Sequence, residues 1–184
     1  MRIAIIMLSM LAISHAGEQS KKISPLPKEL AGGSIPNFFV LAADNETELD
    51  RKSLKEEAKR LGAKRVVLSF FATWCVNCQK EFVLLRQSAS RLKENGVLVY
   101  LIDVGEKIAS HGDKVRRFAE EYAGDAFPFY FDQSGNLLKN FGIIERSQTQ
   151  FNLPVIVVAD ADLRVLSVFT EAGDDFPQIL WSEL

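Results

Sequence analysis

The two cysteines of the chain, Cys75 and Cys78, are the residues whose type and spacing best suit covalent chemistry. Two thiols separated by two residues can close a small disulfide, and a thiolate is the nucleophile of disulfide exchange. The same spacing also occurs in half of a zinc site and in purely structural disulfides. The elements that position the pair therefore decide which chemistry to expect.

The pair lies where an apolar run gives way to a helical pattern. Val66 to Phe71 is mostly β-branched or aromatic, which predicts a strand buried on both faces of a sheet. After Cys78 the apolar residues recur at helical spacing, at Phe82, Leu85, Ala89 and Leu92. The cysteines are thus expected in the first helical turn, where unpaired N–H groups and the helix dipole favour a thiolate. Cys75 is the expected attacker and Cys78, one turn further in and less exposed, the expected resolving thiol.

At these residues the chain resembles the thioredoxin superfamily, and more closely its periplasmic TlpA/ResA/CcmG-like thiol-disulfide oxidoreductases. The resemblance rests on Phe71-Ala72-Thr73-Trp74-Cys75 with Cys78, on Glu81, and on Leu153-Pro154. It implies an α/β, thioredoxin-like fold in which helices flank a mixed central β-sheet. It also implies an extra N-terminal strand and a central insertion, for which Asp103-Val104-Gly105-Glu106 resembles the start.

Glu81 is the third expected catalytic residue. In the resembled family a glutamate at this position lies beside the cysteines and is implicated in proton transfer. Glu81 follows Cys78 by three residues, so on a helix the two share a face, and the carboxylate could accept the proton of Cys78 or raise its pKa. The alternative is a solvated surface carboxylate that contributes little to stability and adds negative charge. Ser69 stands where cytoplasmic thioredoxins carry a buried aspartate, so proton handling should fall to Glu81 or to water.

The resemblance also implies a substrate-binding set of Trp74, Leu153 and Pro154. A proline at the start of a strand normally removes a ladder hydrogen bond. In the family a cis-proline faces the cysteines at this point, and the backbone of the preceding residue pairs with an extended substrate peptide. We therefore expect a cis bond between Leu153 and Pro154, against the alternative of an ordinary proline at a strand start.

The chain departs from the family pattern in three places. Asn77 stands where a proline often precedes the second cysteine, and Val83 stands where a proline often kinks the helix. Glu145 to Gln150 lengthens the loop before Pro154. The first departure affects the redox potential, because the residues between the cysteines tune their pKa values. The third alters the rim where substrates dock.

The other expected elements complete the thioredoxin order. Ser53 is expected to cap a helix that Gly62 ends, since Ser53-Leu54-Lys55-Glu56 matches a capping box. Periodicity and turn residues predict strands over residues 37–43, 97–104, 129–131, 155–159 and 164–169, and helices over residues 113–122, 137–141 and 176–184.

Composition excludes several classes of protein. The 184 residues, 47% of them hydrophobic, suit one globular domain of ordinary size. The net charge is -2, and acidic and basic residues are interspersed, so the sequence shows no basic cluster that would bind nucleic acid. The expected partners are therefore proteins. His111 is the only histidine beyond residue 16, and zinc or copper sites need more histidine or cysteine than this. No metal and no cofactor is expected.

Residues 1–16 are predicted to be a secretory signal peptide. Arg2 is followed by an apolar stretch too short to cross a bilayer, and Ser14-His15-Ala16 forms a cleavage site of small residues. The mature protein should then start at Gly17, with residues 17–34 as a flexible lead-in and residues 35–184 as the thioredoxin-like domain. The alternative is an uncleaved anchor. A periplasmic location would be oxidising, so the dithiol stays reduced only if electrons are delivered to it.

These expectations combine into an exported, periplasmic thiol-disulfide oxidoreductase. Net reduction of protein disulfides is favoured, for example of apocytochrome c in cytochrome c maturation, with electrons from a membrane donor of the DsbD/CcdA type. An oxidant or isomerase of secreted proteins is the alternative among enzymes. From a different class, the domain could be a binding module with a structural disulfide, or a metallochaperone.

Overall fold

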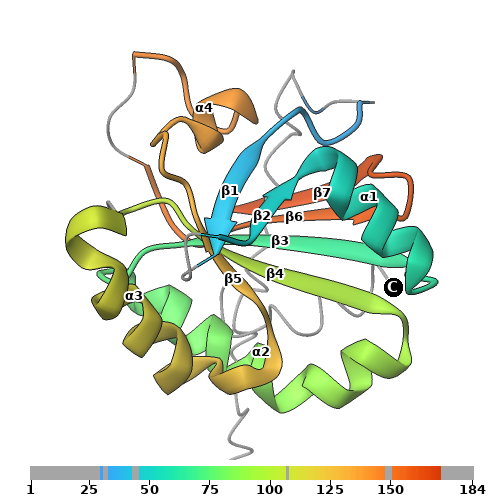
Figure 1. Ribbon diagram of the computed structural model, residues 1–184, viewed down its shortest axis with the longest axis horizontal. Helices are drawn as coiled ribbons and strands as arrows, with labels where there is room; N and C mark the ends of the chain where they lie inside the picture. The colour runs from blue at the N-terminus through green and yellow to red at the C-terminus, as the bar shows by residue number, and fades with distance from the viewer. Residues whose placement is uncertain (1–29, 31–32, 43–45, 107, 148–150, 171–184) are drawn as a thin grey trace, which may run out of the picture.

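The computed structural model describes residues 30, 33–42, 46–106, 108–147 and 151–170. Within this part of the chain one mixed sheet has the strand order β2-β1-β5-β4-β3-β6-β7 (Figure 1). Its strands are β1 (Phe39–Ala42), β2 (Glu48–Asp50), β3 (Arg65–Phe71), β4 (Val97–Asp103), β5 (Phe129–Phe131), β6 (Val155–Asp160) and β7 (Val165–Thr170). The mixed sheet was expected from the sequence.

Helices cover both faces of this sheet. They are α1 (Arg51–Arg60), α2 (Val76–Glu94), α3 (Ile108–Tyr122) and α4 (Leu137–Asn140), with a short 3-10 turn η1 (Gly124–Ala126) after α3. In Figure 1, α2 and α3 lie together below the sheet, whereas α1 and α4 lie above it. None of the described helices is both long and apolar enough to span a bilayer.

Strand β3 lies inside the sheet and leads to the cysteines. It pairs in parallel with β4 and antiparallel with β6, and its residues from Val66 to Phe71 are buried, as predicted. Successive side chains of a strand point to opposite faces. Phe71 accordingly packs against Phe82 of α2 at a ring-centroid distance of 4.8 Å, whereas Phe70 packs against Phe141, next to α4, at 5.3 Å. The end of β3 is therefore held from both sides.

The start of α1 differs from the prediction. The N-cap is Asp50, not Ser53: the Asp50 carboxylate accepts from the Ser53 N–H at 2.7 Å, and the Ser53 hydroxyl accepts from the Asp50 N–H at 2.9 Å. A capping box is present, but it begins three residues earlier, because an aspartate caps as well as a serine. Glu56, the expected partner of Ser53, instead lies 3.9 Å from Lys52. Gly62, with φ of 63°, ends the helix as expected.

Other differences concern the bounds of elements. The short strand β2 was not predicted, and its three residues pair with β1. Helix α3 begins at Ile108 rather than at Asp113. Strand β5 matches its predicted range, and the other predicted strands differ from theirs by one or two residues at their ends. The predicted hairpin of β6 and β7 is confirmed as an antiparallel pair, and the predicted helix over residues 176–184 lies outside the described residues.

The capping box gives a first prediction. Asp50→Ala should lower the free energy of unfolding by about 1 kcal/mol, because the Ser53 N–H loses its acceptor. Chemical denaturation of the purified protein measures the change. Glu56→Ala is the matched control on the same helix, since its exposed pair with Lys52 is worth less than about 0.5 kcal/mol. Equal losses of unfolding free energy in the two variants would contradict the assignment of Asp50 as the N-cap.

Candidate active site

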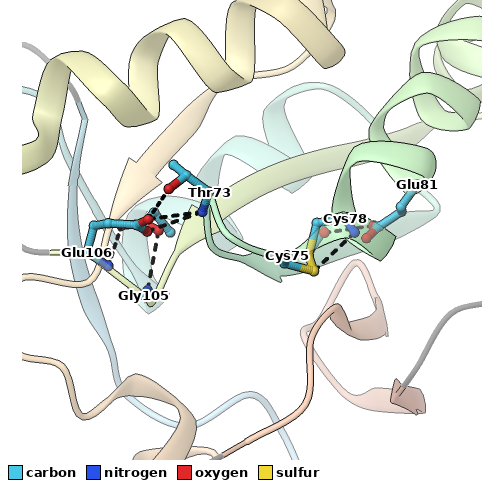
Figure 2. The surroundings of a disulfide bond; sticks show 8 residues. Thr73, Cys75, Cys78, Glu81, Gly105 and Glu106 are labelled. Atoms are coloured by element: carbon cyan, nitrogen blue, oxygen red, sulfur yellow. Dashed lines mark hydrogen bonds between the residues drawn. A yellow bond between two sulfur atoms is a disulfide. The ribbon is translucent and has the colours of Figure 1, made fainter.

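The two cysteines lie at the N-terminus of α2 and are joined as a disulfide (Figure 2). Their Cα atoms are 5.3 Å apart. Cys75 is the N-cap residue, and its Sγ accepts a hydrogen bond from the Cys78 N–H at 3.1 Å. Cys75 is 5% exposed and Cys78 is fully buried, which confirms the predicted order of accessibility.

A tight turn between β3 and α2 creates this geometry. The Cys75 N–H donates to the Ala72 carbonyl at 3.0 Å, and α2 starts at the next residue, Val76. The Cys75 sulfur consequently lies at the first helical turn, where the Cys78 N–H donates to it. A negative charge on that sulfur would be stabilised by this hydrogen bond and by the helix dipole.

A groove of about 350 Å³ lies beside the disulfide. It is lined by Trp74, Cys75, Val76, Asn77, Phe151, Asn152 and Leu153. The ring centroids of Trp74 and Phe151 are 6.2 Å apart, so an aromatic pair bounds the groove. Trp74 is 56% exposed and Val76 is 64% exposed. Phe151 follows the lengthened loop and was not predicted as a site residue.

The peptide bond between Leu153 and Pro154 is cis, as predicted. Leu153 lines the groove together with the cysteine loop, and Pro154 is buried directly before β6. The structure therefore brings two of the three predicted substrate-binding residues, Trp74 and Leu153, to the same groove as Cys75. Pro154 follows directly but is not among the lining residues.

Glu81 is buried, so the alternative of a solvated surface carboxylate is wrong. Only 2% of the residue is exposed. The Ser69 hydroxyl donates to Glu81 Oε1 at 2.7 Å, and Oε2 has no hydrogen-bond partner among the described residues. Burial raises the pKa of the Glu81 carboxyl to about 8, against the lowering effect of the Ser69 hydrogen bond. At neutral pH the group is mainly an uncharged acid.

The strand and helix periods explain why Ser69 meets Glu81. Ser69 and Phe71 are two residues apart on β3, so both point to the face that α2 covers. Cys78 and Glu81 are three residues apart on α2, and both belong to its buried face. Ser69 was predicted to leave its position without an ionisable group, and the Glu81 carboxyl of α2 lies at that position instead.

A second polar cluster beside the cysteine loop was not predicted as a site. It joins Thr73 to the turn after β4: the Thr73 N–H and hydroxyl both donate to the Glu106 carboxylate (Figure 2). The Asp103 carboxyl accepts from the Gly105 N–H at 3.3 Å and from the Glu106 N–H at 3.2 Å. Lys114 of α3 lies 3.6 Å from Glu106.

The two carboxyl groups of this cluster have pKa values shifted in opposite directions. Burial raises the pKa of Asp103 to about 9, and the hydrogen bond with Glu106 and its charge add to the effect. For Glu106, burial would raise the pKa, but the hydrogen bonds from Asp103 and Thr73 and the charge of Lys114 outweigh it and lower the pKa. Asp103 is therefore the protonated member and Glu106 the charged one.

The signal for this cluster was present in the sequence. β3 and β4 are parallel neighbours, with Phe71 opposite Asp103, so the segments that follow them emerge at the same edge of the sheet. Since a strand–helix–strand unit joins parallel strands, the predicted order of elements could have placed Asp103 and Glu106 beside the cysteine loop. No group of three His, Cys, Asp or Glu side chains suited to a metal ion occurs in the described part of the chain, and the side chain of His111 lies outside it.

A protein-family model described as Redoxin matches residues 30–180. The chain belongs to the Redoxin family. Among curated proteins it is 30% identical over 135 residues to the thiol-disulfide oxidoreductase ResA of Bacillus thuringiensis subsp. konkukian, covering 73% of the chain and 66% of that relative. ResA of Bacillus subtilis is 30% identical over 140 residues, covering 76% of the chain and 66% of the relative. The matched segments thus span just under two thirds of these relatives.

Solved structures agree on the fold. A thiol:disulfide interchange protein of the thioredoxin family from Chlorobium tepidum TLS superposes with a TM-score of 0.59 at 24% identity, covering 83% of the chain and 96% of the neighbour. At this identity the likeness shows the fold alone. The predicted thioredoxin-like fold and the resemblance to the ResA branch are both confirmed.

The burial of Glu81 predicts a pH dependence of stability. Between about pH 4.5 and 8 the folded protein holds a proton on Glu81 that the unfolded chain releases, so stability falls as the pH rises through this window. The contribution is at most about 1.4 kcal/mol per pH unit. Glu81→Gln removes it, so the stability of wild type relative to this variant should fall between pH 5 and pH 8. Denaturant unfolding at each pH measures the difference.

Glu94→Gln is the matched control, because Glu94 is an exposed carboxylate on the same helix. Its stability should follow that of wild type across the range. Asp103 titrates in all three proteins, so its effect cancels from the comparison. Parallel curves for wild type and Glu81→Gln would contradict the raised pKa of Glu81.

Proposed function

We propose that the chain is an exported thiol-disulfide oxidoreductase that exchanges disulfides with target proteins. The observation that carries the proposal is the cysteine pair itself: a slightly exposed Cys75 caps a helix, a buried Cys78 follows, and a groove opens beside them. Membership of the Redoxin family and the names of the ResA relatives support the same class of reaction.

The proposed reaction has two exchange steps. In the reduced protein the Cys75 thiolate attacks one sulfur of a target disulfide, which forms a mixed disulfide and releases the other target sulfur as a thiolate. The Cys78 thiolate then attacks the Cys75 sulfur, restores the Cys75–Cys78 disulfide, and releases the second target thiolate. Two electrons pass to the target, so an external dithiol donor must reduce Cys75 and Cys78 for the next cycle.

Glu81 is proposed to exchange the proton of Cys78. Cys78 attacks only as a thiolate, and its burial makes direct loss of the proton to water slow. Cys78 and Glu81 belong to the same buried face of α2, and Glu81 Oε2 has no hydrogen-bond partner among the described residues. With a pKa of about 8, a minority of the Glu81 carboxyl groups is ionised at pH 7, and this ionised form would accept the Cys78 proton.

The groove is proposed to bind an extended target segment. Trp74, Val76 and Phe151 give it an apolar rim, which suits an apolar side chain next to the target cysteine. Leu153 lines the same groove as Cys75, which supports the proposed pairing of its backbone with the peptide. Pro154 is proposed to fix the direction of that backbone.

Net reduction is the favoured direction. A strong oxidant needs extra positive charge or donors that stabilise the thiolate of its first cysteine. Val76 is apolar, Asn77 is neutral, and neither supplies a charge. One argument from the sequence does not survive: Glu81 was expected to contribute negative charge, but it is mainly protonated at pH 7.

The biological setting is part of the proposal. Export through the predicted signal peptide of residues 1–16 would place the protein in the periplasm. Apocytochrome c is a candidate target and a membrane protein of the DsbD/CcdA type a candidate electron donor. An oxidant or isomerase is the alternative among enzymes, and a binding module or metallochaperone the alternative of another class.

The two cysteines should behave differently when replaced. Cys75→Ser should abolish reduction of a model protein disulfide, because the attacking thiol is missing. Cys78→Ser should accumulate mixed disulfides with the target, since nothing resolves them. Non-reducing gel electrophoresis and a turnover assay measure the two effects, with the Cys75→Ser, Cys78→Ser double variant as control. Trapping by Cys75→Ser but not by Cys78→Ser would reverse the roles.

The redox potential decides the direction. We expect a value on the order of -250 mV at pH 7, compared with about -120 mV for a strong oxidant. Titration against glutathione buffers, followed by alkylation of free thiols, measures it. A value well above about -180 mV would exclude the reductase assignment and favour an oxidant or isomerase. A disulfide that resists reduction at moderate potentials would instead favour a structural role.

A further inference from the structure

The loop that carries Cys75 is held from the side by the acidic turn after β4. We propose that Glu106, itself held by Asp103, is a positioning residue that fixes the loop Ala72–Cys75 and so keeps the Cys75 sulfur on the N–H groups of α2. The inference rests on the proposed function, because it assigns a role to Cys75 as the reactive thiol.

The first support is the set of contacts between Glu106 and Thr73. The Thr73 N–H lies 3.1 Å from Oε1 and 3.3 Å from Oε2 of Glu106, and the Thr73 hydroxyl donates to Oε1 as well. Thr73 is 8% exposed and stands two residues before Cys75. Figure 2 shows the Glu106 carboxylate pointing at Thr73 from the turn that follows the neighbouring strand β4. One carboxylate thus accepts both polar hydrogens of the residue that connects β3 to the cysteine turn.

The second support is how Glu106 is held. The Glu106 side chain is only 6% exposed, and a buried charge is stable only with partners. Lys114 supplies a positive charge at 3.6 Å, and Asp103 accepts the Glu106 N–H. Because Asp103 is protonated, it also donates to the Glu106 carboxylate instead of repelling it. Asp103 therefore keeps the Glu106 side chain directed toward Thr73.

The third support is the packing of Gly105. A Cβ atom at this position would overlap the Ala72 Cβ and would lie 3.0 Å from Nε1 of Trp74. The Val104 N–H also donates to the Phe71 carbonyl at 2.9 Å, which extends the pairing of β3 and β4 to the loop. The acidic turn consequently contacts the loop with its backbone as well as with Glu106. Movement of the turn would displace both Trp74 and Cys75.

The experiment measures the thiolate of Cys75 without any protein substrate. In a Cys78→Ser background, Cys75 is the only thiol, and its rate of alkylation by iodoacetamide as a function of pH gives its pKa. Glu106→Ala should raise that pKa and slow alkylation at pH 7 by about fivefold or more, because the loop loses charge-assisted hydrogen bonds. Glu106→Gln, which keeps an acceptor oxygen for Thr73, should restore part of the rate.

Asp103 provides a matched pair of variants. Asp103→Asn has the shape of the protonated acid and can still donate to Glu106, so its alkylation rate should stay within about twofold of the parent. Asp103→Ala should resemble Glu106→Ala. Glu120→Ala, which removes an exposed carboxylate of α3, should change nothing. Equal losses of alkylation rate in Asp103→Asn and Asp103→Ala would contradict the assignment of the proton to Asp103.

Fluorescence provides a second measurement. Trp181→Phe leaves Trp74 as the only tryptophan, so its emission reports the loop directly. Gly105→Ala and Glu106→Ala should both shift that emission. A lowered melting temperature with unchanged alkylation and unchanged emission would show a merely structural role and overturn the proposal. Because no target protein is involved, loss of the disulfide-exchange function itself would not change these readouts.

Discussion

The parallel pairing of β3 with β4 is the constraint on which the site depends. Parallel strands deliver their carboxyl ends to the same edge of a sheet, and here Phe71 lies opposite Asp103. The cysteine turn and the start of α2, which follow Phe71, therefore lie beside the turn that follows Asp103. Phe82 and Phe118 pack on Phe71 from one face of the sheet and so hold the end of β3 in place.

Two buried carboxyl groups surround the cysteine turn, and each avoids the cost of a buried charge in the same way. Glu81 holds its own proton and accepts one hydrogen bond, from Ser69. Asp103 holds a proton beside the charged Glu106, which Lys114 and Thr73 stabilise. A low-dielectric interior penalises an isolated anion strongly, so protonation is the least costly solution for both groups. The charge near the cysteines thus depends on whether Glu81 and Asp103 are protonated, and not only on which residues are present.

The sequence was sufficient where local pattern decides the outcome. The strand before Cys75, the helix after it and the cis Leu153–Pro154 bond all follow from spacing or from the resemblance, and the structure agrees. The failures at the site are tertiary, whereas the misplaced cap of α1 and the missed strand β2 are local. Whether Glu81 faces water or the core depends on how α2 packs on Ser69, and periodicity alone does not fix this rotation for a charged residue. Phe151 meets the site through a loop, so only a three-dimensional arrangement places it there, whereas the strand order was a usable but overlooked signal for Glu106.

The use of a cysteine as the N-cap of α2 links redox state to folding. A cap must accept from the first N–H groups of its helix, and a charged sulfur does this better than a neutral one. Reduction followed by deprotonation therefore strengthens the end of α2, while oxidation replaces that charge with a covalent staple between the cap and the first turn. By a thermodynamic cycle, the difference in stability between the two redox forms equals the difference between the potentials of the folded and the unfolded couple, expressed as free energy. About 30 mV of potential corresponds to about 1.4 kcal/mol of folding free energy.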